Sequence, residues 1–139
     1  MLSVVYVSVA DPALSTADIE ALVGQAQANN ARDELTGALI YNGQNFMQLL
    51  EGASDKVEAR LGAIRADPRH HGMIEIRRRT VDTREFAGWS MLYSPLFRDH
   101  DADLARLAAN GRLDPQDQLL MENFLGLGRS RSASADPAA

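Results

Sequence analysis

The feature that most constrains the fold is the N-terminal run from Leu2 to Val9, because this run is apolar on both faces of an extended chain. Its side chains alternate in two sets, Leu2, Val4, Tyr6 and Ser8 on one face and Val5, Val7 and Val9 on the other. A strand that is apolar on both faces needs a packed layer on each side. The run therefore predicts a central strand of a sheet that is covered on both faces.

Two helices are predicted in the first half of the chain. Ser15 and Asp18 have the spacing of a capping box, and the helix that they begin should run to about Asn30. Ser54 is predicted to cap the second helix, which Asp67-Pro68 ends. Apolar residues recur at helical spacing in both helices: Ile19, Leu22, Val23 and Ala26 in the first, and Val57, Leu61 and Ile64 in the second.

Four more strands are predicted, at residues 35–41, 45–51, 73–81 and 86–93. The pair Asn42-Gly43 favours a two-residue type I′ hairpin between the first two of them. The resulting order is βαββαββ, and two helices that cross one side of a mixed five-stranded sheet form a ferredoxin-like α+β sandwich. This arrangement leaves the other face of the sheet open.

The C-terminal part of the chain is predicted to cover that face. One helix is expected over residues 101–109, and Asp114 and Pro115 begin another whose apolar face is wide. Together they form a two-helix cap over residues 96–127, following a first domain at residues 1–95. From Gly128 to residue 139 the chain is rich in Arg, Ser and Ala, which predicts a disordered tail.

Composition narrows the classes of function. The chain has 139 residues, enough for one domain, and no cysteine, which excludes disulfides, thiol nucleophiles and cysteine-based metal centres. Its net charge of −5 argues against general nucleic-acid binding. No apolar run approaches the roughly 20 residues of a membrane span and no signal peptide is apparent, so we expect a cytoplasmic protein.

Two clusters of charged and histidine residues can each be interpreted either as structural or as functional. His70-His71 with Asp67 suggests a metal site, but adjacent side chains diverge and no third ligand is suitably spaced, so no metal is expected. The run Arg77–Arg79, with Arg84, is either a solvated edge strand protected by charge or a surface for an anionic partner.

Polar side chains occupy positions where the pattern calls for apolar ones. Gln48 lies between Phe46 and Leu50 on a strand whose two faces both look buried. Burying an unpaired amide costs about 1–3 kcal/mol, so Gln48 should have a partner. Tyr6 poses the same question on the first strand, and Asn30 extends the apolar stripe of the first helix, with Asn29 beside it. Three amides and a phenol that converge in this way could bind a flat ring rich in hydrogen-bonding groups, although Asn30 alone could simply end its helix.

From Leu2 to about Tyr93 the chain resembles the BLUF domain, a flavin-binding sensor of blue light. The matching pieces occur in the family's order: Tyr6-Val7-Ser8, Asn29-Asn30-Ala31-Arg32, Leu35-Thr36-Gly37-Ala38-Leu39, Phe46-Met47-Gln48-Leu49-Leu50-Glu51-Gly52, Asp67-Pro68-Arg69-His70 and Phe86-Ala87-Gly88-Trp89-Ser90-Met91. The resemblance implies the ferredoxin-like fold with a flavin between its two helices. FAD is the expected flavin, and the residues do not discriminate it from FMN or riboflavin.

The resemblance also implies roles for individual residues. Tyr6 corresponds to the photoactive tyrosine, and Gln48 to the glutamine between this tyrosine and flavin N5 and O4. The implied photoactive set is completed by Trp89, Met91 and Ser8. The implied flavin contacts are Asn29, Asn30, Gln48, Leu39, Phe46, Ile64, Asp67, Arg69 and His70. Pro68 departs from the polar or basic residue that is usual in the family at this place, next to the implied phosphate contacts.

The function implied by the resemblance is sensory and not enzymatic. Light-driven electron and proton transfer from Tyr6, by way of Gln48, would rearrange the hydrogen bonds to flavin O4 and N5 and produce a reversible red shift. The signal would pass to an unidentified partner protein or to the interface of a homo-oligomer, with no membrane and no nucleic acid as direct partner. The alternative is a ferredoxin-like small enzyme or ligand-binding regulator that lacks flavin.

Overall fold

The computed structural model describes residues 1–88, 90, 92–94 and 113–134, with side chains for all of these except 92–94 and 125–134. Its elements are β1 (Leu2–Ala10), α1 (Thr16–Arg32), β2 (Thr36–Tyr41), β3 (Asn45–Gly52), α2 (Ser54–Arg65), β4 (His70–Thr80), β5 (Leu92–Ser94) and α4 (Pro115–Ser134). The predicted helix at 101–109 and the predicted site residues Trp89 and Met91 lie outside the described residues.

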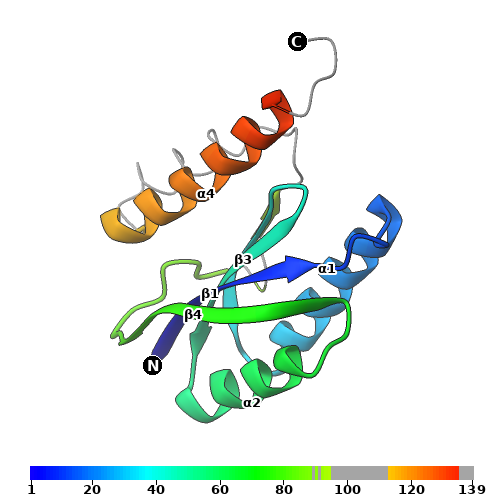
Figure 1. Ribbon diagram of the computed structural model, residues 1–139. Coiled ribbons are helices and arrows are strands. Elements are labelled where there is room, and N and C mark those ends of the chain that lie inside the picture. Colours follow the sequence, from blue (N-terminus) through cyan, green and yellow to red (C-terminus); the bar gives the residue numbers. More distant parts are fainter. Residues whose placement is uncertain (89, 91, 95–112, 135–139) are drawn as a thin grey trace.

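The sheet has five strands in the order β4-β1-β3-β2-β5. All pairs are antiparallel except β2 and β5, which run parallel. The apolar run of β1 therefore lies inside the sheet, as its two apolar faces predict. Helices α1 and α2 lie on one side of the sheet and α4 on the other (Figure 1), so the predicted mixed α+β sandwich is confirmed.

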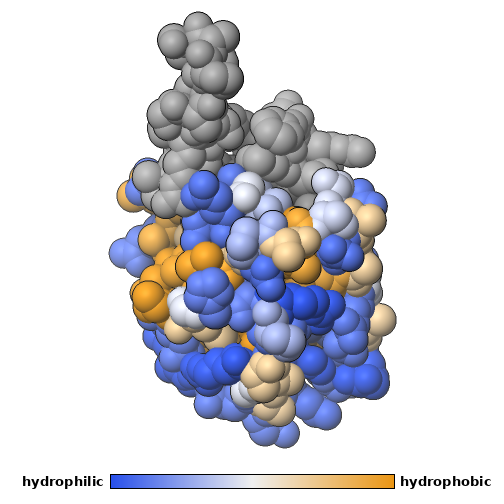
Figure 2. All heavy atoms as spheres, turned by 45° about the vertical axis from the view of Figure 1, so that its right-hand side comes forward, coloured by the Kyte–Doolittle hydropathy of each residue, from blue (hydrophilic) through white to orange (hydrophobic). Residues whose placement is uncertain are grey.

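Two separate cores form on the two faces of the sheet. The first contains Leu2, Val4 and Tyr6 of β1 with apolar residues of α1 and α2. The second contains Val5 of β1 with Met121 and Phe124 of α4. Alternate residues of β1 thus belong to different cores, because successive side chains of a strand point to opposite faces. On the face drawn in Figure 2, hydrophilic residues cover most of the surface and apolar side chains gather in patches between them.

Helix α1 begins with the predicted capping box. The hydroxyl of Ser15 accepts a hydrogen bond from Asp18 N at 3.1 Å, and the carboxylate of Asp18 accepts one from Ser15 N at 2.9 Å. The prediction for α2 is wrong in one detail, because Ser54 is its first helical residue and Ala53 stands at the cap without a side-chain bond. The acidic Asp55 in the first turn is favourably placed at the positive end of the helix instead.

The hairpin between β2 and β3 differs from the predicted type I′ turn. That turn needs positive φ at both Asn42 and Gly43, but only Gly43 has one, at 100°. Asn42 faces Asn45 across the hairpin, and its side-chain oxygen accepts hydrogen bonds from Gln44 N at 3.2 Å and Asn45 N at 2.9 Å. The side chain of Asn42 thus satisfies backbone groups of the turn. The two central residues of the turn are Gly43 and Gln44, one position later than predicted.

The last strand is shorter than the predicted 86–93, because residues 85–88 form a turn. The buried carboxylate of Glu51 accepts hydrogen bonds from Glu85 N at 2.8 Å and Phe86 N at 2.9 Å. These amides are thereby occupied by a side chain and not by a neighbouring strand. Gly88 then adopts a φ of 86°, which turns the chain before β5 begins.

The arginines of β4 attach α4 to the sheet. Arg77 donates to Asp117 at 2.6 and 3.0 Å, and Arg79 donates to the same carboxylate at 2.9 Å. Arg78 is paired with Glu58 and Glu75, and Arg84 donates to Glu34 O at 2.8 Å. Strand β4 lies at the edge of the sheet, as the first sequence-based alternative predicted. All four arginines bind groups of this chain, which neither alternative predicted.

Helix α4 also continues to Ser134, through residues 128–134 that were predicted to be disordered. The Arg, Ser and Ala residues there do not oppose continuation of an established helix, because adding a residue to a helix costs far less than nucleating one.

Candidate functional site

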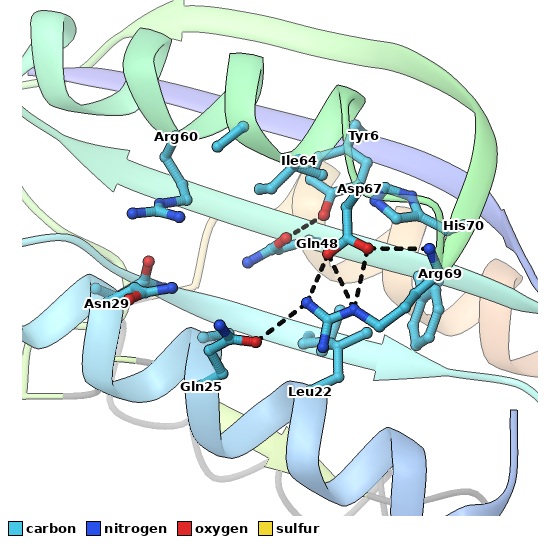
Figure 3. A pocket seen from close by; sticks show the side chains of 15 residues that line it. Tyr6, Leu22, Gln25, Asn29, Gln48, Arg60, Ile64, Asp67, Arg69 and His70 are labelled. Carbon is cyan, nitrogen blue, oxygen red and sulfur yellow. Dashed lines mark hydrogen bonds and ion pairs between the residues drawn. The ribbon is translucent and has the colours of Figure 1, made fainter.

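A cavity of about 300 Å³ lies between the sheet and the two helices α1 and α2. Its lining residues come from α1, α2, the first three strands and the α2–β4 connection with the start of β4 (Figure 3): Tyr6, Leu22, Gln25, Ala26, Asn29, Asn30, Leu39, Phe46, Gln48, Arg60, Ala63, Ile64, Asp67, Arg69 and His70. All nine residues predicted as flavin contacts, and Tyr6, are in this set. The tertiary structure therefore brings together side chains that lie up to 64 positions apart in the sequence.

The sheet side of the cavity carries a hydrogen-bonded pair, Tyr6 and Gln48. The two residues are register partners on β1 and β3, and the Tyr6 hydroxyl donates to Oε1 of Gln48. Both are almost completely buried, with 3% and 4% of their surface exposed. Burial raises the pKa of Tyr6 and the negative charge of Asp67 raises it further, so the phenol keeps its proton. The partner expected for the buried amide of Gln48 is therefore present.

Asn30 lies in the last turn of α1 with its side chain buried. Its Nδ2 donates to Ser90 O at 2.9 Å, and its backbone oxygen accepts from Leu35 N at 2.8 Å. The residue thus connects the helix, the start of β2 and the segment before β5 at the border of the cavity. Asn29 lines the cavity beside it.

The opposite end of the cavity contains an ion pair with several hydrogen bonds. Nε of Arg69 lies 3.0 Å from both oxygens of Asp67, and Nη2 lies 2.6 Å from Oδ2 (Figure 3). These bonds lower the pKa of Asp67, so the carboxylate stays ionised. Gln25 of α1 accepts from Arg69 at 3.2 Å, which links α1 to the α2–β4 connection. Burial lowers the pKa of His70, so its ring is predominantly neutral near neutral pH.

Ser8, which the resemblance included in the photoactive set, is not among the residues that line this cavity. It is buried and paired with Phe46 across the sheet, and its hydroxyl has no hydrogen-bond partner among the described residues. Ser8 lies on the same face of β1 as Tyr6, two residues further along the strand.

Five lining residues were not predicted as part of the site: Leu22, Gln25, Ala26, Arg60 and Ala63. Leu22 and Ala26 belong to the apolar stripe of α1, a pattern that indicates core packing. Arg60 stands four residues before Ile64, a spacing that places both on one face of a helix. That spacing is the one signal for Arg60 in the sequence, and it is weak because an arginine on a short helix is usually in solvent.

The part of the chain that the structure describes holds neither a cluster of metal-ligating side chains nor a membrane-spanning helix. No group of three or more His, Asp or Glu side chains there could bind a metal ion. No helix within those residues is long and apolar enough to span a bilayer.

The fold and the cavity together define a small α+β domain with a pocket between its sheet and two helices, lined by both apolar and polar side chains. The sequence profile of the BLUF family, described as sensors of blue light using FAD, matches residues 1–92. The chain therefore belongs to the BLUF family of flavin-dependent blue-light sensors, as the sequence resemblance predicted.

Curated relatives and solved structures agree with this assignment. The blue light- and temperature-regulated antirepressor BluF of Escherichia coli is 36% identical over 85 residues, which is 61% of this chain and 21% of the relative. The photoactivated adenylate cyclase subunit beta of Euglena longa is 30% identical over 92 residues, which is 66% of this chain and 11% of the relative. The chain thus spans about a fifth or less of the length that these two relatives have.

Among solved structures, the BLUF protein BlrB in its dark state superposes with a TM-score of 0.68 at 31% identity, and the match covers 96% of each chain. Klebsiella pneumoniae BlrP1, in a complex with manganese and cyclic diGMP, gives a TM-score of 0.78 at 30% identity. That match covers 91% of this chain and 33% of BlrP1. The predicted ferredoxin-like fold is confirmed by this likeness.

Proposed function

We propose that the cavity holds the flavin ring between α1 and α2, and that Tyr6 and Gln48 convert light absorption into a new hydrogen-bond pattern. The observation that carries this proposal is the Tyr6–Gln48 hydrogen bond in the cavity wall. A volume of about 300 Å³ lies at the lower end of the range for small-molecule sites. Leu22, Leu39 and Ile64 supply apolar walls for a flat ring.

The polar groups of the cavity also suit a flavin. Amides from Asn29, Asn30 and Gln48 can both donate and accept hydrogen bonds, which fits the alternating carbonyl and N–H groups of a flavin's pyrimidine ring. Nδ1 of His70 is buried without a partner among the described residues, and a bound ligand would satisfy it. Arg69 and Asp67 at the other end suit the hydroxyl groups of the ribityl chain.

When bound, the flavin supplies absorption of blue light and an excited state that is a strong oxidant. Tyr6 is the phenol in the cavity wall, and its raised pKa means that it still carries a proton when it gives up an electron. Gln48 Oε1 accepts the hydrogen bond of that phenol and can accept the proton. The amide of Gln48 can present oxygen or N–H toward the ring, so rotation or tautomerisation of this side chain is the step that stores the signal.

The test of flavin binding is the absorption spectrum of the purified protein. The wild type should be yellow and should show a small red shift under blue light that reverses in darkness, because a stronger hydrogen bond to flavin O4 lowers the excitation energy of the ring. Chromatography of the released pigment should identify FAD, with FMN and riboflavin as the alternatives. A colourless protein that stays unresponsive after reconstitution with all three flavins would favour the flavin-free alternative.

We also propose that this domain acts by signalling and not by catalysis. Its output would reach a partner protein, or a change in self-association, through the segment that follows β5 and through α4, which packs on the sheet face opposite the cavity. In this proposal residues 1–95 form the sensor domain and residues 96–127 form the C-terminal cap. Size-exclusion chromatography in darkness and under blue light should reveal a light-dependent change in assembly if the oligomer transmits the signal.

A further inference from the structure

Arg60 of α2 is a cavity-lining residue for which neither the sequence pattern nor the family assignment provides a role. Its side chain is only 19% exposed, although the residue belongs to a short helix at the edge of the molecule. One end of its guanidinium is occupied, because Nη2 lies 3.2 Å from Oδ2 of Asp33, the C-cap residue that follows α1. This ion pair positions the guanidinium across the space between the two helices.

The other polar atom of interest is Nε of Arg60, which is buried and has no hydrogen-bond partner among the described residues. A buried N–H without a partner costs free energy, about as much as a lost hydrogen bond, so a partner is expected at this place. The second arginine in the cavity differs, because Arg69 is occupied by Asp67 and Gln25. Arg60 therefore retains a donor for a ligand after its protein contacts are made.

The position of Arg60 indicates which part of a ligand it would meet. Figure 3 shows Arg60 at the same end of the cavity as Asn29, while Asp67, Arg69 and His70 lie at the other end. The only carboxylate among the described lining residues is Asp67, at that other end. The Arg60 end thus offers amides and a cationic N–H donor, an environment that suits neutral carbonyl oxygens.

We propose that Arg60 is a flavin-contacting residue whose Nε–H donates a hydrogen bond to a carbonyl oxygen of the pyrimidine ring. This inference rests on the proposed flavin site. A flavin has its two carbonyl groups on one end of the ring and methyl groups on the other, so the polar end of the ring matches the Arg60 and Asn29 end of the cavity. A guanidinium there stabilises negative charge on the pyrimidine ring and contributes affinity that does not depend on the phosphate.

The test compares binding of lumiflavin, riboflavin and FMN to the wild type and to Arg60→Met, measured by quenching of flavin fluorescence. A hydrogen bond from a charged donor corresponds to about a tenfold change in affinity. R60M should therefore bind all three ligands about tenfold more weakly, because all three share the ring. A loss confined to FMN would place Arg60 at the phosphate and overturn the proposal, as would unchanged affinity for lumiflavin.

Two matched variants separate a ligand contact from a structural role. Arg65→Met removes an arginine from the same helix, where Arg65 pairs with Glu75 and does not line the cavity, and should leave affinity unchanged. Asp33→Asn removes the ion-pair partner of Arg60 and should change affinity less than twofold. If D33N weakens binding as much as R60M does, Arg60 acts only by joining the helices and the proposal is wrong.

A spectroscopic measurement reports the contact directly. With flavin labelled with ¹³C at C2 or at C4, R60M should shift one carbonyl stretching band to higher frequency, because that carbonyl loses a hydrogen bond. Arg60→Lys retains the charge, and its affinity for flavin should be about threefold weaker than that of the wild type. If R60M does not fold, the affinities of R60K and the wild type for the same three ligands are compared instead. A wild-type protein that binds no lumiflavin would refute the flavin site itself, whereas wild-type-like R60M would refute only the role of Arg60.

Discussion

Tyr6 and Gln48 are register partners on adjacent antiparallel strands, and their side chains meet in a hydrogen bond in the wall of the cavity. The register is set by the whole length of β1 and β3, from Leu2 opposite Gly52 to Val9 opposite Asn45. A shift of either strand by one residue would move its member of the pair to the face covered by α4 and separate the two side chains. The Tyr6–Gln48 contact therefore depends on the register of the sheet as well as on the identity of its two residues.

Replacing Tyr6 with Phe should abolish the reversible red shift and leave flavin binding within a few-fold of the wild type. The change removes the hydroxyl that donates to Gln48 but retains the ring in the core. The measurement is a light-minus-dark absorption spectrum with flavin occupancy determined in parallel. Tyr41→Phe is the matched control, because the Tyr41 hydroxyl donates to Gly43 O in the hairpin and does not line the cavity. A red shift that persists in Y6F would contradict the proposed role of Tyr6.

Replacing Asp117 with Asn should destabilise the protein by about 3–5 kcal/mol, the range measured when one partner of a buried ion pair is removed. Asp117 is fully buried and accepts from both Arg77 and Arg79. The variant therefore removes the carboxylate that pairs with Arg77, whereas Arg79 keeps its ion pairs with Glu85 and Asp114. Urea denaturation followed by circular dichroism measures the change. Glu122→Gln on the exposed side of α4 is the control, and it should change stability by less than about 0.5 kcal/mol. Equal stability of the two variants would mean that α4 is not attached through Asp117.

The stability of the protein should carry a pH-dependent contribution from Glu85. Burial, and next the neighbouring Asp117, raise the pKa of Glu85 to about 7 from 4.5. Because the folded state then binds more protons than the unfolded state between about pH 4.5 and 7, rising pH through this window removes stability. The variant Glu85→Gln lacks this titrating group, so it does not lose this stability as the pH rises. The free energy of unfolding of E85Q minus that of the wild type should therefore increase from about pH 5 to about pH 7. A constant or decreasing difference would contradict the raised pKa.

Two glycines should respond to alanine in opposite directions. A Cβ at Gly37 of β2 would lie 1.9 Å from Leu49 O, a backbone atom that cannot move aside without breaking the sheet. A Cβ at Gly24 of α1 would have no atom within 4 Å apart from those of its own helix. Alanine at this position should stabilise the helix by about 0.5–1 kcal/mol relative to glycine. Thermal denaturation should show G37A strongly destabilised and G24A stabilised. Similar melting temperatures for the two variants would contradict the close approach of β2 to β3.

Much of the candidate site could be predicted because its residues contradict their local pattern. Gln48 is polar within an apolar strand, and Asn30 extends an apolar helical stripe, so both stand out in the amino-acid sequence alone. Arg60 does not stand out, since arginine is common on exposed helices. Its inclusion in the cavity depends on how closely α2 approaches α1, and the Arg60–Asp33 contact across that space joins residues 27 positions apart.

The amino-acid sequence by itself determined the central strand, the two crossing helices, the identity of the flavin-binding family and the residues expected to surround a ring, because periodicity and residue type act locally. Only the tertiary structure decided how charges pair and where chain segments turn. Arg77 meets Asp117 across 40 positions, and Glu51 takes up the amides of Glu85 and Phe86 that a longer β5 would have used. Such contacts depend on which elements pack together, since a buried charge must find its partner wherever the fold places one.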